Sequence, residues 1–380
     1  MKGVIKIGRK RSERIDTLLL ATVILLALYG TVMVFSAGLS YAEARYGDSL
    51  YFVKRQLIWL TVGIAVMLLA SKSDISLVKK YTPLAYIITL LLLILTLVIG
   101  FTGNGAQRWI SLGPITIQPS EIAKLTVVAM LARYFSENEE RACLDKRGRI
   151  SLLYGTLIPC VILVIPILLI MLQKHLSCII ILGTIGLLLI VCSGIRLRYI
   201  AGFVGLGVAG VSYIALFTEY TKDRITVWQD PEAYKLTGGW QTLQGLMAIG
   251  SGGIFGKGIG NGELKQCYVS EPANDMIFAI LCEELGLIGA LIAMLLFAIL
   301  IWRGVRIALS SEDTYSRLIT LGITIKVAVQ ALLNIAVVTN TIPNTGISLP
   351  FFSYGGSSLV MLFFEMGIIL SVSKKSRLRK

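Results

Sequence analysis

The sequence predicts an all-α polytopic membrane protein in which residues 1–380 form one domain of about ten transmembrane helices. Two observations support this fold class. The chain is 55% hydrophobic and only 15% charged, whereas about a quarter of the residues in a soluble domain are charged. In addition, apolar runs of about 17 residues or more, the length that crosses a hydrocarbon core of roughly 30 Å, recur along the whole chain.

The expected spans cover residues 16–38, 54–71, 81–100, 119–135, 151–171, 176–192, 198–217, 275–303, 316–340 and 354–373. The basic segment before the first span is followed by no small-residue cleavage site, so we expect a retained helix and not a removed signal peptide. Residues 151–192 are too long for one span. A polar break at residues 173–175 therefore divides them into two.

Charge predicts the orientation of these spans. With residues 1–15 and 374–380 both in the cytoplasm, the cytoplasmic pieces hold 23 Lys and Arg, and the external pieces with their flanks hold 10. This bias follows the positive-inside rule. The same flanking residues account for the net charge of +14, because they attract anionic lipid headgroups. Nucleic-acid binding is not indicated, since no soluble domain carries a basic patch interleaved with aromatics.

Three irregular segments fall on the external side of this topology. They are residues 101–118, which contain Trp109, the Gly-rich residues 218–274, and residues 340–354. We expect the first to be a re-entrant or interfacial element anchored by Trp109. The second is a long external loop with semi-apolar pieces such as residues 243–249, and a loop of this length usually has a function. A shared external site is therefore expected.

Polar residues inside spans usually face the bundle interior and lie on a functional path. Glu121 and Lys124 stand three residues apart at the start of the fourth span. They form either a structural ion pair or, with Arg108 and the positive helix terminus, a site for a pyrophosphate headgroup. The spacing leaves both alternatives open.

A polar stripe of Lys326, Gln330 and Asn334 recurs every four residues along the ninth span. Interhelical hydrogen bonding is favoured over direct substrate binding for such a stripe. Glu365, and Glu283 with Glu284, are intramembrane carboxylates of the kind that form proton or ion relays. These carboxylates leave a transporter function as an alternative.

Asp275 is the strongest single candidate for a catalytic residue, because it stands where the long external loop enters the eighth span. It either N-caps that helix or acts as a general base that takes a proton from a sugar hydroxyl. Arg224 and Lys257 in the same loop could offset the charge of a leaving group. His175, at the break in residues 173–175, is more typical of a polar hinge than of a catalyst.

Six cysteines show no paired metal spacing, so neither a zinc site nor a disulfide framework is expected; they are Cys143, Cys160, Cys178, Cys192, Cys267 and Cys282.

Five segments in order resemble the SEDS family (shape, elongation, division and sporulation), which includes the FtsW, RodA and SpoVE proteins. They are residues 105–110 (GAQRWI), 118–124 (QPSEIAK), 250–258 (GSGGIFGKG), 275–279 (DMIFA) with 283–286 (EELG), and 343–358. The resemblance covers essentially the whole chain. The segments 338–339, 347–350 and 283–286 favour the division (FtsW) or sporulation type over the elongation type.

The resemblance implies an inverting peptidoglycan glycosyltransferase of the bacterial cytoplasmic membrane that polymerises lipid II on its outer face. It further implies a class B penicillin-binding protein and divisome proteins as partners, undecaprenyl pyrophosphate as the leaving group, and Mg²⁺ or Mn²⁺ as a possible cation. Asp275 matches the family's essential aspartate, and Glu121 and Lys124 match residues of its central cavity. The candidate substrate-binding residues are Arg108, Glu121, Lys124, Arg224, Lys257, Lys326, Gln330, Asn334, Ser353 and Ser357.

Three positions depart from the family pattern. Residues 173–175 read Gln-Lys-His where the family often has Gln-Pro-Asp, Asn274 replaces a common threonine, and Gln107 replaces a common arginine. Two other functions compete with the polymerase. A lipid II flippase would use the charges of Lys124, Lys326 and Glu365, and a scaffold would only recruit the cross-linking enzyme.

Overall fold

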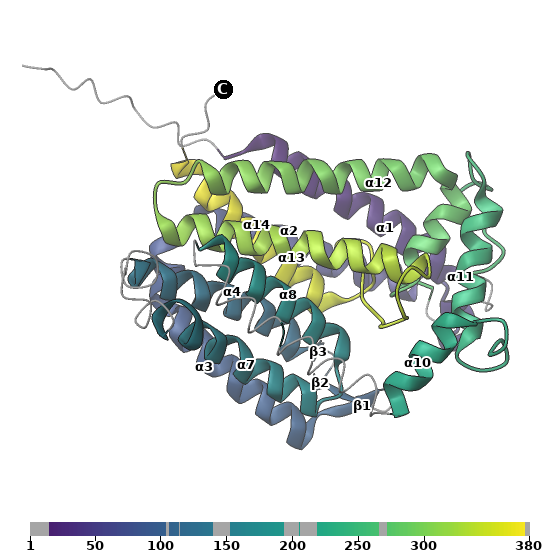
Figure 1. Ribbon diagram of the computed structural model, residues 1–380. Coiled ribbons are helices and arrows are strands. Elements are labelled where there is room, and N and C mark those ends of the chain that lie inside the picture. The colour runs from purple at the N-terminus through teal and green to yellow at the C-terminus, as the bar shows by residue number, and fades with distance from the viewer. Residues whose placement is uncertain are drawn as a thin grey trace, which may run out of the picture.

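The computed structural model describes residues 15–103, 106–113, 115–139, 153–193, 205, 219–265 and 272–376. In this part of the chain the long helices lie side by side along one direction, and a small sheet sits at one end (Figure 1). Seven of the described helices are long and apolar enough to cross a membrane. The predicted span 198–217 lies outside the described residues apart from position 205.

The other nine predicted spans are each present as a helix. They are α1 (Thr17–Tyr46), α2 (Tyr51–Lys72), α3 (Ile75–Ile99), α4 (Pro119–Glu137), α7 (Ile158–Leu172) preceded by the π-helical turn η1 (Leu153–Leu157), α8 (Leu176–Cys192), α12 (Ile277–Leu309), α13 (Thr314–Val338) and α14 (Gly356–Lys375). The expected break at residues 173–175 is confirmed. Helix α1 runs well past its apolar stretch. It ends at Gly47, which has a left-handed backbone conformation (φ +67°).

One end of the bundle, here called the terminal end, carries Asp16, Asp74, residues 310–313 and Ser376. The backbone N–H of Asp16 donates to Ser373 Oγ at 3.1 Å, and Lys375 pairs with Asp74 at 2.8 Å. Arg303 near the end of α12 also pairs with Asp16. The first and last described residues therefore lie at the same end.

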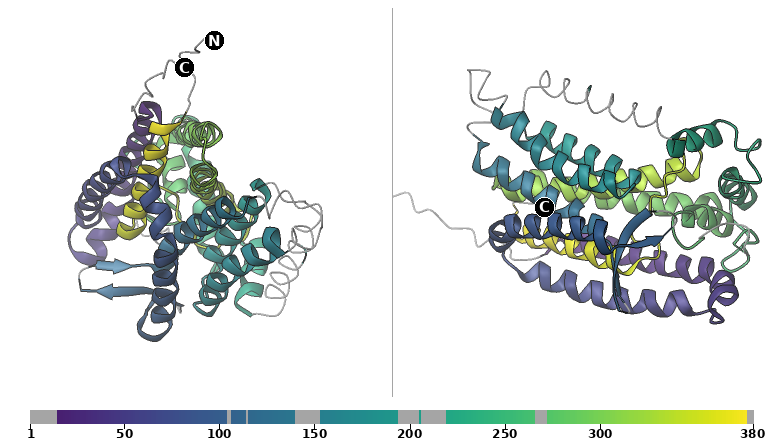
Figure 2. Two further views of the ribbon diagram at one scale, coloured as in Figure 1. Left: turned by 90° about the vertical axis from the view of Figure 1, so that its left-hand side faces the viewer. Right: turned by 90° about the horizontal axis from the view of Figure 1, so that it is seen from below.

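The opposite end, here called the sheet end, carries the strands β1 (Phe101–Gly103), β2 (Ala106–Leu112) and β3 (Ile115–Ile117). They form an antiparallel sheet in the order β1-β2-β3, with Ile110 opposite Ile117 (Figure 2). The expectation of a re-entrant or interfacial element missed these strands. Gly113 (φ +67°) turns the chain between β2 and β3, and β3 leads into α4, whose first residue is Pro119.

The long loop 218–274 contains two helices at the sheet end, α10 (Glu219–Gln229) and α11 (Gly239–Gly252). The predicted semi-apolar piece 243–249 belongs to α11, which lies beside α12 (Figure 1).

Helix α14 is central and packs closely on α2. A Cβ atom at Gly63 would lie 2.3 Å from the Phe363 ring, and one at Gly367 would lie 2.6 Å from the Met67 carbonyl oxygen. Small residues of this kind let helix backbones approach in a membrane protein. The close packing places the first turn of α14 beside the irregular residues 340–355.

Candidate functional site

The site is built around a turn of residues 272–276 that leads into α12. Helix α12 begins at Ile277, and its N-cap residue is Met276. The prediction that Asp275 N-caps this helix is therefore wrong, because the turn places the aspartate one residue before the cap position. Asp275 is half-buried at the sheet end of the bundle.

Neighbouring elements hold this turn through its backbone carbonyls. Asn334 Nδ2 of α13 donates to the Asp275 carbonyl at 2.9 Å and to the Ile347 carbonyl at 2.6 Å. Ser353 Oγ donates to the Asn274 carbonyl at 2.6 Å and accepts from the Leu349 N–H at 2.7 Å. Both polar side chains are buried, so these hydrogen bonds fix the backbone on which the Asp275 carboxylate stands.

The loop of residues 340–355 borders the Asp275 carboxylate. Gly346 has a φ of +66°, and a Cβ atom there would lie 3.5 Å from Asp275 Oδ2. Helix α10 covers the same loop: Arg224 donates to the Asn344 carbonyl, and Trp228 Nε1 donates to the Asn340 carbonyl at 2.9 Å. Arg224 therefore reaches the loop that borders Asp275.

Four charged residues form a buried, charge-balanced cluster between α4, α13 and α14. Lys124 Nζ lies 2.7 Å from Glu121 Oε1 and 3.2 Å from Gln330 Oε1. Lys326 Nζ lies 2.6 Å from Glu365 Oε1. The ion-pair alternative for Glu121 and Lys124 is thus confirmed, while the anion-binding role stays a prediction. Glu365 is not a lone carboxylate, because α13 supplies its partner.

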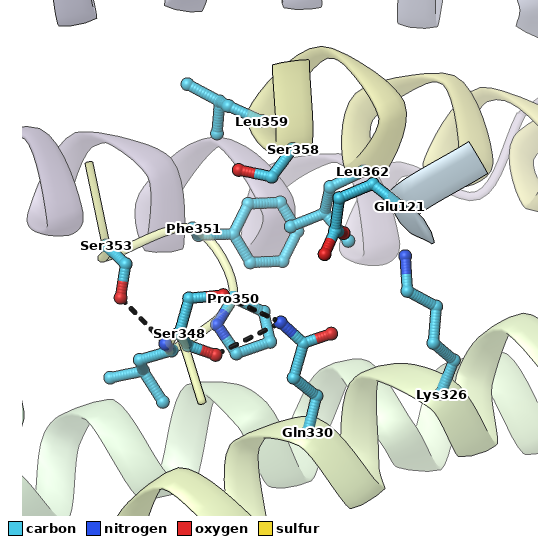
Figure 3. Close-up of a pocket in the computed structure, with 11 residues that line it drawn as sticks. Glu121, Lys326, Gln330, Ser348, Pro350, Phe351, Ser353, Ser358, Leu359 and Leu362 are labelled. Carbon is cyan, nitrogen blue, oxygen red and sulfur yellow. Dashed lines mark hydrogen bonds between the residues drawn. The ribbon is translucent and has the colours of Figure 1, made fainter. Parts of the chain in front are cut away.

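A small polar cavity lies between this cluster and residues 348–353. Figure 3 shows Gln330 directed toward that loop, with its Nε2 donating to Ser348, and Lys326 directed toward Glu121. Ser358, Leu359 and Leu362 of α14 close the other side. Its free volume of about 20 Å³ suffices for about one water molecule. In this conformation the cavity therefore has no room for a larger ligand.

The predicted stripe of Lys326, Gln330 and Asn334 lies on one buried face of α13. Each member contacts a different partner: Glu365, the 348–353 loop and the Asp275 turn. Interhelical and helix–loop hydrogen bonding, the favoured interpretation, is present. Ser357 is half-buried in the first turn of α14, one residue before the cavity-lining Ser358.

His175 connects the break between α7 and α8 to the start of α4. Its Nδ1 lies 3.3 Å from Ser120 Oγ, and Arg108 of β2 donates to the Lys174 carbonyl at 2.7 Å. Burial, and then the charge of Arg108, lower the pKa of His175 to about 3. The imidazole is therefore neutral near pH 7.

Glu283 and Glu284 of α12 are fully buried, and each is ion-paired. Their role in a proton or ion relay stays a prediction. Lys257 Nζ lies 3.1 Å from Glu283, and Lys265 Nζ lies 2.6 Å from Glu284. The hydrogen bond that Lys257 donates to Glu283 raises the pKa of Lys257 and keeps it protonated. Lys265, together with Ser36 on α1, is a buried polar residue that sequence reasoning did not single out.

Among the described residues, no group of three or more His, Cys, Asp or Glu side chains could hold a metal ion. Mg²⁺ is usually bound by one or two carboxylates together with substrate phosphates. Cys143 and Cys267 lie outside the described residues, and the other four cysteines are free thiols.

Comparison with known proteins identifies the family to which this chain is similar. The FtsW/RodA/SpoVE family model, described as cell cycle protein, matches residues 16–378. Stage V sporulation protein E of Bacillus subtilis is 38% identical over 365 residues, which cover 95% of this chain and 98% of that protein. A probable peptidoglycan glycosyltransferase FtsW of Geobacter metallireducens is 34% identical over 375 residues, covering 98% of both chains.

Solved structures share the fold. A chain of a peptidoglycan synthase complex, described as coordinating polymerization and crosslinking, aligns with a TM-score of 0.78 at 24% identity, covering 96% of this chain and 99% of that chain. The rod shape determining protein RodA of Thermus thermophilus aligns with a TM-score of 0.69 at 23% identity, covering 96% and 98%. The all-helical polytopic membrane fold expected from the sequence is thereby confirmed.

Proposed function

The chain belongs to the FtsW/RodA/SpoVE family of cell cycle proteins, and we propose on this basis that it is a peptidoglycan glycosyltransferase. It polymerises lipid II into glycan strands on the outer face of the bacterial cytoplasmic membrane. The sheet end of the bundle faces outward, and the terminal end lies in the cytoplasm. Relatives named as probable peptidoglycan glycosyltransferases support this activity at 34% and 36% identity over nearly the full chain.

The observation that carries the proposal is the fixed position of the Asp275 turn. Asn334 and Ser353 hold it next to a loop that also lines the buried polar cavity. A carboxylate held in this way can accept a proton from an acceptor sugar hydroxyl as that oxygen attacks. The anomeric carbon of the donor is then inverted, and undecaprenyl pyrophosphate leaves.

The remaining candidate residues have supporting roles in this proposal. Arg224 and Arg108 stand at the sheet end, where the lipid-linked pyrophosphate would lie, and guanidinium groups bind phosphate oxygens well. Lys124 and Lys326, already paired with Glu121 and Glu365, hold α4, α13 and α14 around the cavity. Such compensation weakens the case for a flippase that would use the charges of Lys124, Lys326 and Glu365.

Polymerisation of lipid II by the purified protein in vesicles, with and without its class B penicillin-binding protein, tests the proposal. Asp275→Asn removes the proton acceptor with little change in shape, so we expect at least about a hundredfold loss of rate. Asp223→Asn, at an exposed position of α10, is the matched control and should polymerise at the wild-type rate. Wild-type rates from Asp275→Asn would overturn the assignment.

The relatives include a stage V sporulation protein and FtsW proteins, and we propose that this chain acts in sporulation or in division. Its partner is then the class B penicillin-binding protein that works at the division septum or in the forming spore. Deletion of the chain followed by complementation separates the two roles, because a division enzyme is needed during growth and a sporulation enzyme is not.

A further inference from the structure

Helix α12 is broken at Gly286, which has a φ of +64° and a ψ of −163°. Figure 1 shows the helix changing direction beside α11. A break in a helix leaves carbonyl groups before it and N–H groups after it without helical partners. Such groups are costly inside a membrane unless another segment of the protein binds them.

The Gly-rich loop that follows α11 binds both sets of groups. The N–H groups of Lys257 and Gly258 donate to the carbonyls of Glu283 and Glu284 at 3.0 and 2.9 Å. In return, the N–H groups of Leu287 and Ile288 donate to the carbonyls of Gly253 and Ile254 at 2.9 and 3.2 Å. The loop thus completes the hydrogen bonding of the broken helix on both sides of the break.

Two glycines make this contact possible. A Cβ atom at Gly256 would lie 2.2 Å from the Glu284 carbonyl oxygen, and one at Gly286 would lie 2.4 Å from the Gly256 nitrogen. The two backbones are therefore closer than any side chain would allow. Both residues also have a positive φ, which glycine adopts without strain.

Side chains lock the same contact. Lys265 Nζ lies 2.6 Å from Glu284 Oε1 and 2.9 Å from Ser36 Oγ, while Ser36 Oγ donates to Glu284 at 2.6 Å. All three residues are buried, and the Gly260 N–H donates to Ser36 Oγ at 3.1 Å. We call Ser36, Lys265 and Glu284 the clasp.

Glu283 reinforces the clasp from the neighbouring position. Its Oε1 accepts from Lys257 Nζ at 3.1 Å and from the N–H groups of Glu263 and Leu264 at 2.9 and 3.3 Å. Lys257 and Lys265 also lie beside the C-terminal end of the part of α12 that precedes Gly286, where the helix dipole favours positive charge. The loop is therefore held by backbone, side-chain and dipole interactions together.

We propose that the clasp residues Lys265, Glu284 and Ser36 are positioning residues for Asp275. The first part of α12, from Ile277 to the break, is a rigid rod of about 13 Å that connects the clasp to the Asp275 turn. The clasp fixes one end of this rod against α1, and Asn334 with Ser353 fix the other. The expected effect of the clasp on the polymerisation rate rests on the proposed function. The coupling between the clasp and the Asp275 turn is structural and does not depend on that function.

Hydrogen exchange tests the coupling without any activity assay. In Lys265→Met, the amides of residues 257–265 and of the turn 272–276 should exchange at least about tenfold faster, with those of α13 unchanged. Arg303→Met, which breaks the pair with Asp16 at the terminal end, is the control and should leave both segments protected. Unchanged exchange of residues 272–276 in Lys265→Met, or equal acceleration throughout α13, would overturn the proposal.

A double variant separates positioning from simple charge balance. Removing one partner of a buried pair leaves an uncompensated charge, whereas removing both relieves much of that cost. Lys265→Met with Glu284→Gln should therefore recover most of the unfolding temperature lost by Lys265→Met alone. Its maximal polymerisation rate should nevertheless stay at least about tenfold below wild type, with the KM for lipid II unchanged.

A double variant that polymerises at the wild-type rate would show that the pair only balances charge, and the positioning role would be wrong. If the wild-type protein makes no polymer, the proposed function fails, and the exchange comparison alone decides whether the clasp controls the Asp275 turn.

Discussion

At the scale of single residues, the Asp275 turn is held by side chains that bind its backbone. Asn334 and Ser353 both donate to main-chain carbonyls of the turn. Neither donates to the Asp275 carboxylate in these hydrogen bonds. In the proposed function, Asn334 and Ser353 fix the geometry of the turn while the Asp275 carboxylate accepts a proton, which is what a positioned general base requires.

Asn334→Ala tests this division. The substitution leaves the carbonyls of Asp275 and Ile347 without their buried donor, so the free energy of unfolding should fall by about 1–3 kcal/mol. The polymerisation rate should fall with it, because the turn is released. Unfolding in detergent or lipid bicelles and the lipid II assay measure the two effects.

Leu332→Ala is the control on the same helix, since Leu332 is 66% exposed and lipid tails are as apolar as leucine. It should leave the stability and the rate unchanged. Equal losses in both variants would show that α13 tolerates no truncation, and would remove the special role given to Asn334.

The sequence predicts which residues of α13 share a face, but it does not predict their partners. The four-residue spacing of Lys326, Gln330 and Asn334 places them together, as the structure confirms. Their partners, including Glu365 and the Asp275 carbonyl, come from other elements. Local spacing carries no information on such distant pairs, and Ser36 and Lys265 were missed for the same reason.

At the scale of elements, apolar runs predict the helices well, because the length of a span is set by the bilayer. The break at residues 173–175 was predicted because polar residues mark it, but the break in α12 was not. Gly286 lies inside a predicted span, and nothing in the apolar pattern around it marks the change in direction. The strands β1 to β3 were also missed, since three-residue strands such as β1 and β3 give too few alternating positions to detect.

Gly286→Ala tests the broken helix. The added methyl group would meet the backbone of residues 254–256 at about 2.5 Å, and an L-residue is strained at a positive φ. We expect the free energy of unfolding to fall by more than about 2 kcal/mol. Thermal unfolding of the purified protein in detergent measures this change.

Gly250→Ala in α11 is the matched control, because a Cβ atom there meets nothing within 4 Å. A helical glycine in open space should tolerate alanine with a gain of up to about 1 kcal/mol. A Gly286→Ala protein as stable as wild type would show that α12 can straighten, and the account of the break would be wrong.

At the scale of the whole molecule, the two ends of the bundle differ in kind. Among the described residues, the terminal end carries turns and ion pairs such as Lys375 with Asp74. The sheet end gathers the irregular elements, namely the small sheet, α10, α11 and residues 340–355 (Figures 1 and 2). Irregular backbone is restricted to places where protein or water satisfies it, so the polar chemistry of the chain concentrates at one membrane face.

The central claim is that the Asp275 carboxylate accepts a proton during glycan synthesis, and chemical rescue tests it most directly. The measurement is the rate of lipid II polymerisation by Asp275→Ala with added formate, against equal concentrations of chloride. The account predicts that the rate falls by at least about a hundredfold in chloride and is partly restored by formate, which can fill the space of the lost carboxylate. Polymerisation by Asp275→Ala at the wild-type rate in chloride would contradict it.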